Sequence, residues 1–139
     1  MTDHFVYGGI DGLVTASTLL ASSAVVGIGS RDLLVIGLST LVADSLSMAF
    51  ASGESEQTGD PVATALITAA AFVLLGAVPV VTRYATGSAV VALAASAATL
   101  IALSLLRGRG PRALQTCARR LLVGAAVVTV SVVVADTLH

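Results

Sequence analysis

Residues 33–53 read LLVIGLSTLVADSLSMAFASG, an apolar run of 21 residues in which Asp44 is the one charged side chain. A helix needs about 20 predominantly apolar residues to cross a bilayer. The run is too long for an ordinary strand, and it lacks the alternation of apolar and polar residues that marks a membrane barrel. It therefore predicts a membrane-spanning helix.

Four further apolar runs occupy most of the remaining chain. Of the 139 residues, 56% are hydrophobic and 11% are charged, whereas about a quarter are charged in an ordinary soluble domain. The sequence predicts an all-α membrane protein of five transmembrane helices joined by short loops, rather than a water-soluble domain. We expect one transmembrane domain over residues 1–139, with spans at about 8–29, 33–53, 62–82, 87–106 and 118–138.

All seven basic residues are arginines, and five of them gather at one end of the predicted bundle. With five spans, one side holds Arg107, Arg109, Arg112, Arg119 and Arg120, and the other holds Arg31 and Arg83. Because basic connections stay in the cytosol, we predict a cytosolic N-terminus and a lumenal or extracellular C-terminus. The alternative is that the cluster serves a lipid headgroup or regulation. The choice of membrane stays open among the vacuolar membrane, another internal membrane and the plasma membrane.

Small residues and prolines give two local expectations. Gly8, Gly12 and Ala16 recur every four residues, and such a face lets helices associate closely in lipid. We therefore expect the first span to pack tightly against a neighbour. Pro61 suits the first turn of the third span, whereas Pro79 is expected to kink that helix or end it early.

Asp44 is the strongest functional signal in the sequence. An acid at the bilayer centre costs about 2.5–3.5 kcal/mol, and no Arg or Lys lies inside the apolar runs to pair with it. Its carboxyl must be protonated, face water or bind a cation. Met48 lies one helical turn away, with Thr40 nearby, and a carboxylate with a thioether can hold a divalent transition metal. For Met48 the alternative is ordinary packing.

Other acidic residues offer weaker candidates. Asp11 lies near the start of the first predicted span, where Thr15 and Thr18 continue a polar stripe at helical spacing. This stripe is typical of a pathway lining, and the alternative is that Asp11 lies at the interface or caps the helix. Glu54 and Glu56 follow the second span as weak cytosolic metal candidates, with a solvated loop as the alternative.

Several classes of function lack support in the sequence. There is no Gly-rich phosphate loop and no Ser–His–Asp set, and both histidines are near the chain ends. We therefore predict no enzyme and no permanently bound cofactor. The net charge of −1 argues against nucleic-acid binding, which requires a basic face.

Three segments resemble the vacuolar iron transporter family. YGGIDGLVTASTLLASSAVVG (residues 7–27) is similar to that family's first helix, which begins with an Asp-Gly-Leu motif. LVADSLSMAFASGE (41–54) is similar to its second helix, and DPVATALITAAAFVLLGAVPVV (60–81) to its third. The last two spans match in hydropathy and in the Arg-rich link between them.

The resemblance implies a five-helix protomer that forms a two-fold homodimer, with an ion path between the two first helices. It implies transport of ferrous iron and/or manganese out of the cytosol in exchange for protons. The family's metal-binding positions match Asp11, Asp44 and Met48, and we place Thr15 and Thr40 along the same path. A two-fold axis would double the ligands. A carboxyl in a low dielectric holds its proton until a cation displaces it.

Two departures from the family pattern keep other functions open. Thr40 stands where some members carry a Glu, and the family's long Glu-rich insertion is replaced by ESEQTGD (54–60). The alternative to a transporter is a non-transporting membrane relative that buffers metal or packs with a partner membrane protein. A third interpretation is transport of another cation, or of protons alone.

Overall fold

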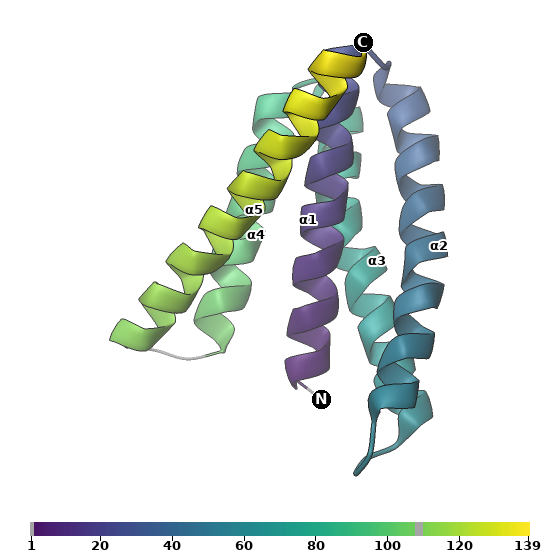
Figure 1. Ribbon diagram of the computed structural model, residues 1–139, viewed down its shortest axis with the longest axis vertical. Coiled ribbons are helices and arrows are strands. Elements are labelled where there is room, and N and C mark those ends of the chain that lie inside the picture. Colours follow the sequence, from purple (N-terminus) through teal and green to yellow (C-terminus); the bar gives the residue numbers. More distant parts are fainter. Residues whose placement is uncertain (1, 108–109) are drawn as a thin grey trace.

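The computed structural model describes residues 2–107 and 110–139, and its architecture is all-helical (Figure 1). Each of its helices is long and apolar enough to cross a membrane, which confirms the prediction of a five-helix membrane fold. The homodimer concerns a second copy of the chain and stays a prediction. The helices are α1 (Thr2–Val26), α2 (Ser30–Ser55), α3 (Pro61–Thr86), α4 (Ala89–Leu106) and α5 (Pro111–Leu138).

The two ends of α3 are fixed by local chemistry. The Asp60 side chain caps its start by accepting hydrogen bonds from the backbone N–H groups of Val62 (2.9 Å) and Ala63 (3.3 Å). Pro61 occupies the first turn, as predicted. The helix stops at Gly87, whose φ of 69° is left-handed and therefore favours glycine.

α3 continues through Pro79 to Thr86, so of the two outcomes expected at this proline, a kink or an early end, the early end is wrong. Proline removes one backbone hydrogen bond, but packing on both sides of it can hold a membrane helix together. Pro79 and Val80 are both buried. Val80 packs directly over Gly37 of α2, where a Cβ would lie 3.1 Å from its methyl groups.

α3 lies at the centre of the bundle and packs against α1 and α2. Its contact with α1 is made by backbone atoms. A Cβ placed on Gly8 would lie 2.5 Å from the carbonyl oxygen of Thr68, and one on Gly12 would lie 2.2 Å from that of Phe72. The predicted tight packing of the first helix is therefore confirmed.

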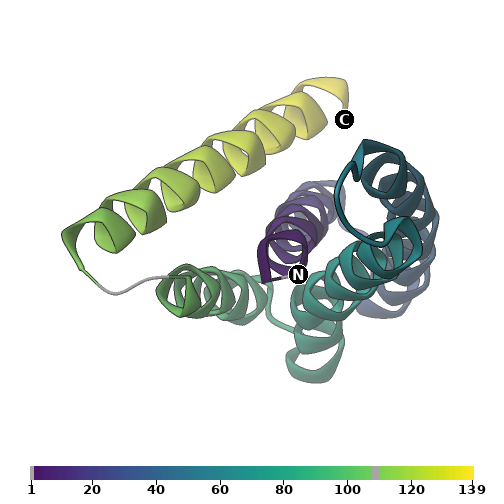
Figure 2. The same ribbon diagram turned by 90° about the horizontal axis from the view of Figure 1, so that it is seen from below.

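α5 is the most loosely packed helix. Within the described residues it contacts α1 and α4, and it lies away from α2 and α3 (Figure 2). Cys117 and Gly124 are its buried residues. The interior of the bundle is therefore built from the first four helices.

The chain ends and links alternate between the two ends of the bundle. The N-terminus, the α2–α3 link and the start of α5 lie at one end, and the C-terminus lies at the other (Figure 1). This is the arrangement expected of five helices that each cross one layer. Arg107 and Arg112 lie at the N-terminal end, whereas Arg31 and Arg83 lie at the opposite end.

Candidate functional site

A polar stripe runs along α1. Asp11, Thr15, Thr18 and Ser22 follow at spacings of four, three and four residues, so they share one face of the helix. Because α1 begins at Thr2, Asp11 lies more than two turns inside it, and the interpretation of Asp11 as a helix cap is wrong. Asp11 is exposed, and the three hydroxyl residues are half-buried.

Thr18 is unusual within this stripe. Its Oγ1 is buried and has no hydrogen-bond partner among the described residues. Other helical threonines, such as Thr68 and Thr82, donate to the carbonyl four residues earlier. A buried hydroxyl without a partner costs about 1–3 kcal/mol. The stripe therefore contains a hydroxyl group, that of Thr18, without a hydrogen-bond partner among the described residues. The spacing in the sequence placed both Thr15 and Thr18 on the stripe and gave no reason to single out Thr18.

Asp44 lies near the middle of α2, as the sequence indicated, and is half-buried. Thr40 and Met48, one turn to either side, are also half-buried. Met48 packs against the apolar cluster that contains Leu41 and Phe72, which supports ordinary packing for at least part of its side chain. Its role as a metal ligand stays a prediction.

Asp11 and Asp44 lie on separate helices, α1 and α2, which contact each other. Within residues 2–107 and 110–139, neither forms an ion pair.

The described part of one chain does not by itself complete a metal centre. It contains no cluster of three or more His, Cys, Asp or Glu side chains that could hold a metal ion. Asp11 and Asp44 provide two carboxylates, so further ligands would have to come from Met48, hydroxyl groups, water or a second copy of the chain.

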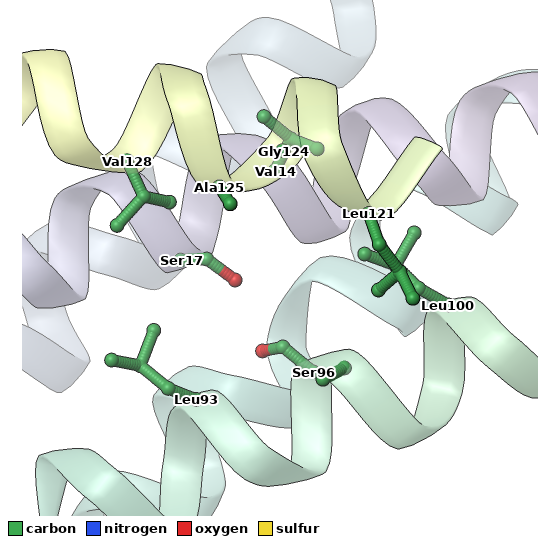
Figure 3. Close-up of a pocket in the computed structure, with 10 residues that line it drawn as sticks. Val14, Ser17, Leu93, Ser96, Leu100, Leu121, Gly124, Ala125 and Val128 are labelled. Atoms are coloured by element: carbon green, nitrogen blue, oxygen red, sulfur yellow. The ribbon is translucent and has the colours of Figure 1, made fainter. Parts of the chain in front are cut away.

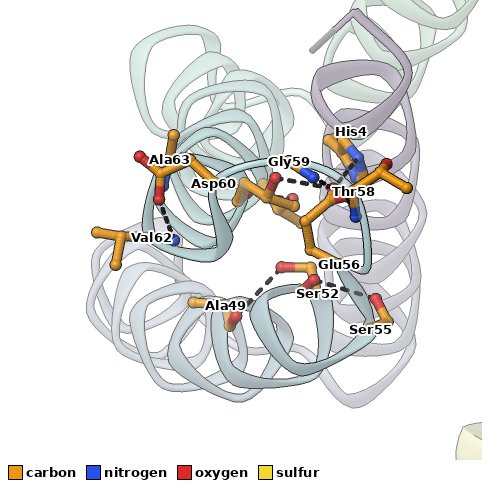
Figure 4. A network of polar contacts seen from close by, with 12 residues as sticks. His4, Ala49, Ser52, Ser55, Glu56, Thr58, Gly59, Asp60, Val62 and Ala63 are labelled. Carbon is orange, nitrogen blue, oxygen red and sulfur yellow. Dashed lines mark hydrogen bonds and ion pairs between the residues drawn. The ribbon is translucent and has the colours of Figure 1, made fainter.

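Glu56 organises the α2–α3 link at the N-terminal end of the bundle (Figure 4). Its Oε1 accepts hydrogen bonds from the backbone N–H groups of Thr58 (3.1 Å) and Gly59 (2.9 Å). Its Oε2 accepts one from Thr64 Oγ1 (3.1 Å) and lies 3.4 Å from His4 Nε2. The backbone hydrogen bonds, followed by that of Thr64, lower the pKa of Glu56 to about 2. Glu56 therefore ties the link to α3 and α1.

Glu54 and Glu56, the two weaker metal candidates, lie in different surroundings. Both oxygens of Glu56 already have donors, so metal binding there would have to displace them. Glu54 is exposed and borders an apolar hollow with Phe50 and Val62. The sequence gave no reason to place His4 in a site, because no other residue stands at the spacing of a metal-ligand pair with it. Its contact with Glu56 depends on the packing of α1 beside the link.

Five long apolar helices with short connections are consistent with a multi-pass integral membrane protein. Comparison of the chain with models of known protein families, with curated proteins and with solved structures gives no match.

Proposed function

We propose that the protein is a membrane transporter for divalent transition-metal ions, ferrous iron or manganese, which it moves out of the cytosol. The observation that carries the proposal is that Asp11 and Asp44 lie on the contacting apolar helices α1 and α2 and form no ion pair among the described residues. Paired acids inside a membrane are costly unless they serve an ion or proton pathway. The resemblance of residues 7–27, 41–54 and 60–81 to the vacuolar iron transporter family supports the choice of ion.

The exposure of Asp11 favours a path at a two-fold dimer interface. Asp11 is exposed on a single chain, and lipid would be an unfavourable neighbour for its carboxyl. A second copy would cover the stripe and supply a second Asp11, Asp44 and Met48. Four carboxylates and two thioethers then face one pathway, enough to replace much of the hydration shell of a divalent ion.

Proton exchange follows from the same pair of acids. A carboxyl in a low dielectric binds its proton more tightly, and an arriving cation displaces that proton. Metal binding from one side is therefore coupled to proton release, and a proton gradient can drive metal in the opposite direction.

The first prediction concerns flux through the purified protein in liposomes. We expect uptake of Fe²⁺ or Mn²⁺ that depends on a proton gradient and falls at least about tenfold in Asp44→Asn and in Asp11→Asn, because each loses a ligand charge. Asp136→Asn is the matched control, since this exposed acid lies near the end of α5. Unchanged flux in Asp44→Asn would contradict the proposed path.

The short α2–α3 link favours one alternative, a non-transporting relative that buffers metal or packs with a partner membrane protein. Glu56 is occupied by the hydrogen bonds that hold this link, so the link offers little capacity for metal capture. This alternative predicts no flux from folded protein, with or without metal binding. Equilibrium binding of Mn²⁺ beside the flux measurement separates buffering from a purely structural role.

A further inference from the structure

An apolar groove separates α5 from α1 and α4 (Figure 3). Leu93 of α4 and Val128 of α5 line it, and Val14 of α1 and Gly124 of α5 lie together at one edge. A second hollow toward the N-terminal end of the bundle is also lined by Val14 and Gly124, so the two hollows adjoin where these residues meet. The second hollow has a volume of about 450 Å³, within the range of roughly 300–1,000 Å³ that is typical of ligand sites.

The groove exists because α5 contributes little side-chain volume where it faces α1. A Cβ added to Gly124 would meet only a methyl group of Val14, at 3.8 Å. A poorly filled apolar groove between membrane helices requires an apolar occupant, because its lining otherwise loses dispersion contacts.

The mouth of the groove is basic. Arg107, Arg119 and Arg120 line it together with Thr116. Arg107 is neutralised, since its Nη2 lies 2.6 Å from Asp3 Oδ1. In the described part of the chain, Arg119 and Arg120 form no ion pair. Two positive charges at the mouth are therefore left to attract an anion.

The mouth lies at the level where lipid headgroups are expected. Nη1 of Arg120 donates a hydrogen bond to Ser104 Oγ (3.4 Å), so Arg120 is level with the last turn of α4. α4 has 18 residues, which corresponds to about 27 Å, close to the roughly 30 Å of the hydrocarbon layer. Lipid phosphates are expected near this end of α4, and guanidinium groups bind phosphate through bidentate hydrogen bonds.

We propose that this groove is a binding site for an anionic phospholipid. The phosphate lies between Arg119 and Arg120, and one acyl chain follows the groove past Gly124 toward Leu93 and Val128. Charge at the mouth and aliphatic side chains along the groove match the two parts of such a molecule. The site does not depend on metal transport, and it stabilises α5 against α1 and α4.

Tyrosine fluorescence offers a direct test, because the chain has no Trp and two tyrosines. Tyr7 lines the mouth, so in a Tyr84→Phe background the signal reports on the site. The probes are phosphatidylglycerol and phosphatidylcholine with brominated acyl chains, titrated into the full chain in detergent. We expect saturable quenching by phosphatidylglycerol at lower concentrations than by phosphatidylcholine. Equal quenching by both lipids would overturn the proposal.

The charge of the mouth is tested with a matched pair of double variants. Arg119→Gln/Arg120→Gln should weaken phosphatidylglycerol binding roughly 30-fold, from the usual contribution of two basic residues near anionic lipid. Arg31→Gln/Arg83→Gln removes the same charge from the opposite end and should leave binding unchanged. An equal effect of both double variants would mean that net charge, rather than the site, attracts the lipid, and would overturn the proposal.

The groove is tested by filling it. Ala125 lines the groove, whereas its exposed neighbour Ala126 does not. Ala125→Leu should weaken lipid binding, and Ala126→Leu should not. This pair of variants tests the proposal even if the double arginine variant fails to fold. Glycerol phosphate, which lacks acyl chains, should not compete. Competition by glycerol phosphate would assign the site to a soluble phosphate ester. Cross-linking of two copies through the groove would assign the groove to a dimer contact. Either result would overturn the proposal.

Discussion

Glu56 joins three parts of the chain through its two carboxylate oxygens, which accept hydrogen bonds from the α2–α3 link and from Thr64 and lie beside His4. These donors favour the charged form and lower the pKa of Glu56 from 4.5 to about 2. A depressed pKa in the folded state contributes stability that is present above pH 4.5 and is lost as the pH falls toward 2.

Glu56→Gln should therefore remove part of the acid sensitivity of folding. The wild-type chain should lose unfolding free energy between pH 5 and about 2, and the variant should lose less, because its amide does not titrate. The measurement is thermal unfolding in detergent over this pH range, with the exposed Glu54→Gln as control. Identical pH profiles for wild type and Glu56→Gln would contradict this account.

Thr18 allows stability and function to be separated at a single atom. Thr18→Val removes a buried hydroxyl without a described partner, and we expect the unfolding free energy to rise by about 1 kcal/mol. If the hydroxyl serves the ion path, the same variant should show a lower flux. Thr18 would then be a functional group that is retained although it lowers stability. Thr68→Val is the control, since its buried hydroxyl donates to Thr64 and its loss should not stabilise. Both quantities are measured on the same preparations by unfolding and by uptake.

Among the contacts between helices, that of α1 with α3 is the most extensive, and glycine residues allow the two helices to approach closely. Gly12→Ala would bring a methyl group to 2.2 Å from a backbone carbonyl of α3, so the helices must separate. We expect a loss of roughly 1–3 kcal/mol or more, as for overpacked cores. Gly124→Ala, in the interior of α5, meets nothing closer than 3.8 Å and should be neutral or stabilising. Comparable destabilisation in both variants would mean that glycine flexibility, rather than close contact, matters at Gly12.

The helices themselves could be predicted because apolar length is a local property. Their ends were less predictable. α1 starts at Thr2, although MTDHFVY is too polar to have been counted in the span, and α5 starts at Pro111 inside the Arg-rich link. Continuation of α3 beyond Pro79 depends on packing over Gly37, which no local pattern contains.

At the scale of the whole molecule, the sequence identified Asp11 and Asp44 separately, and the fold places them on two helices that contact each other. This arrangement depends on how α1 and α2 pack around α3, and the hydrogen bonds of Glu56 depend on the same packing. Residue type and spacing can propose candidates for a site. Which candidates converge is a property of tertiary structure.

The proposed dimer gives a prediction for the whole assembly. In a Cys117→Ala background, Thr15→Cys should form a disulfide-linked dimer in membranes, because Thr15 lies on the stripe expected to face its symmetry mate. Val90→Cys is the control, since Val90 is 76% exposed on α4, away from that stripe. Cross-linking is read on a non-reducing gel, and a dimer formed by Val90→Cys but not by Thr15→Cys would place the interface elsewhere.

The unequal lengths of α4 and α5 have a mechanical consequence. A 28-residue helix is about 42 Å long, so α5 exceeds the hydrocarbon layer unless it tilts or extends into the aqueous phase. α5 is also the helix with the fewest buried residues, and its neighbours restrain its inclination least. Hydrophobic mismatch therefore acts on this helix first: a thicker bilayer lets it stand more upright, and a thinner one leans it further from the bundle.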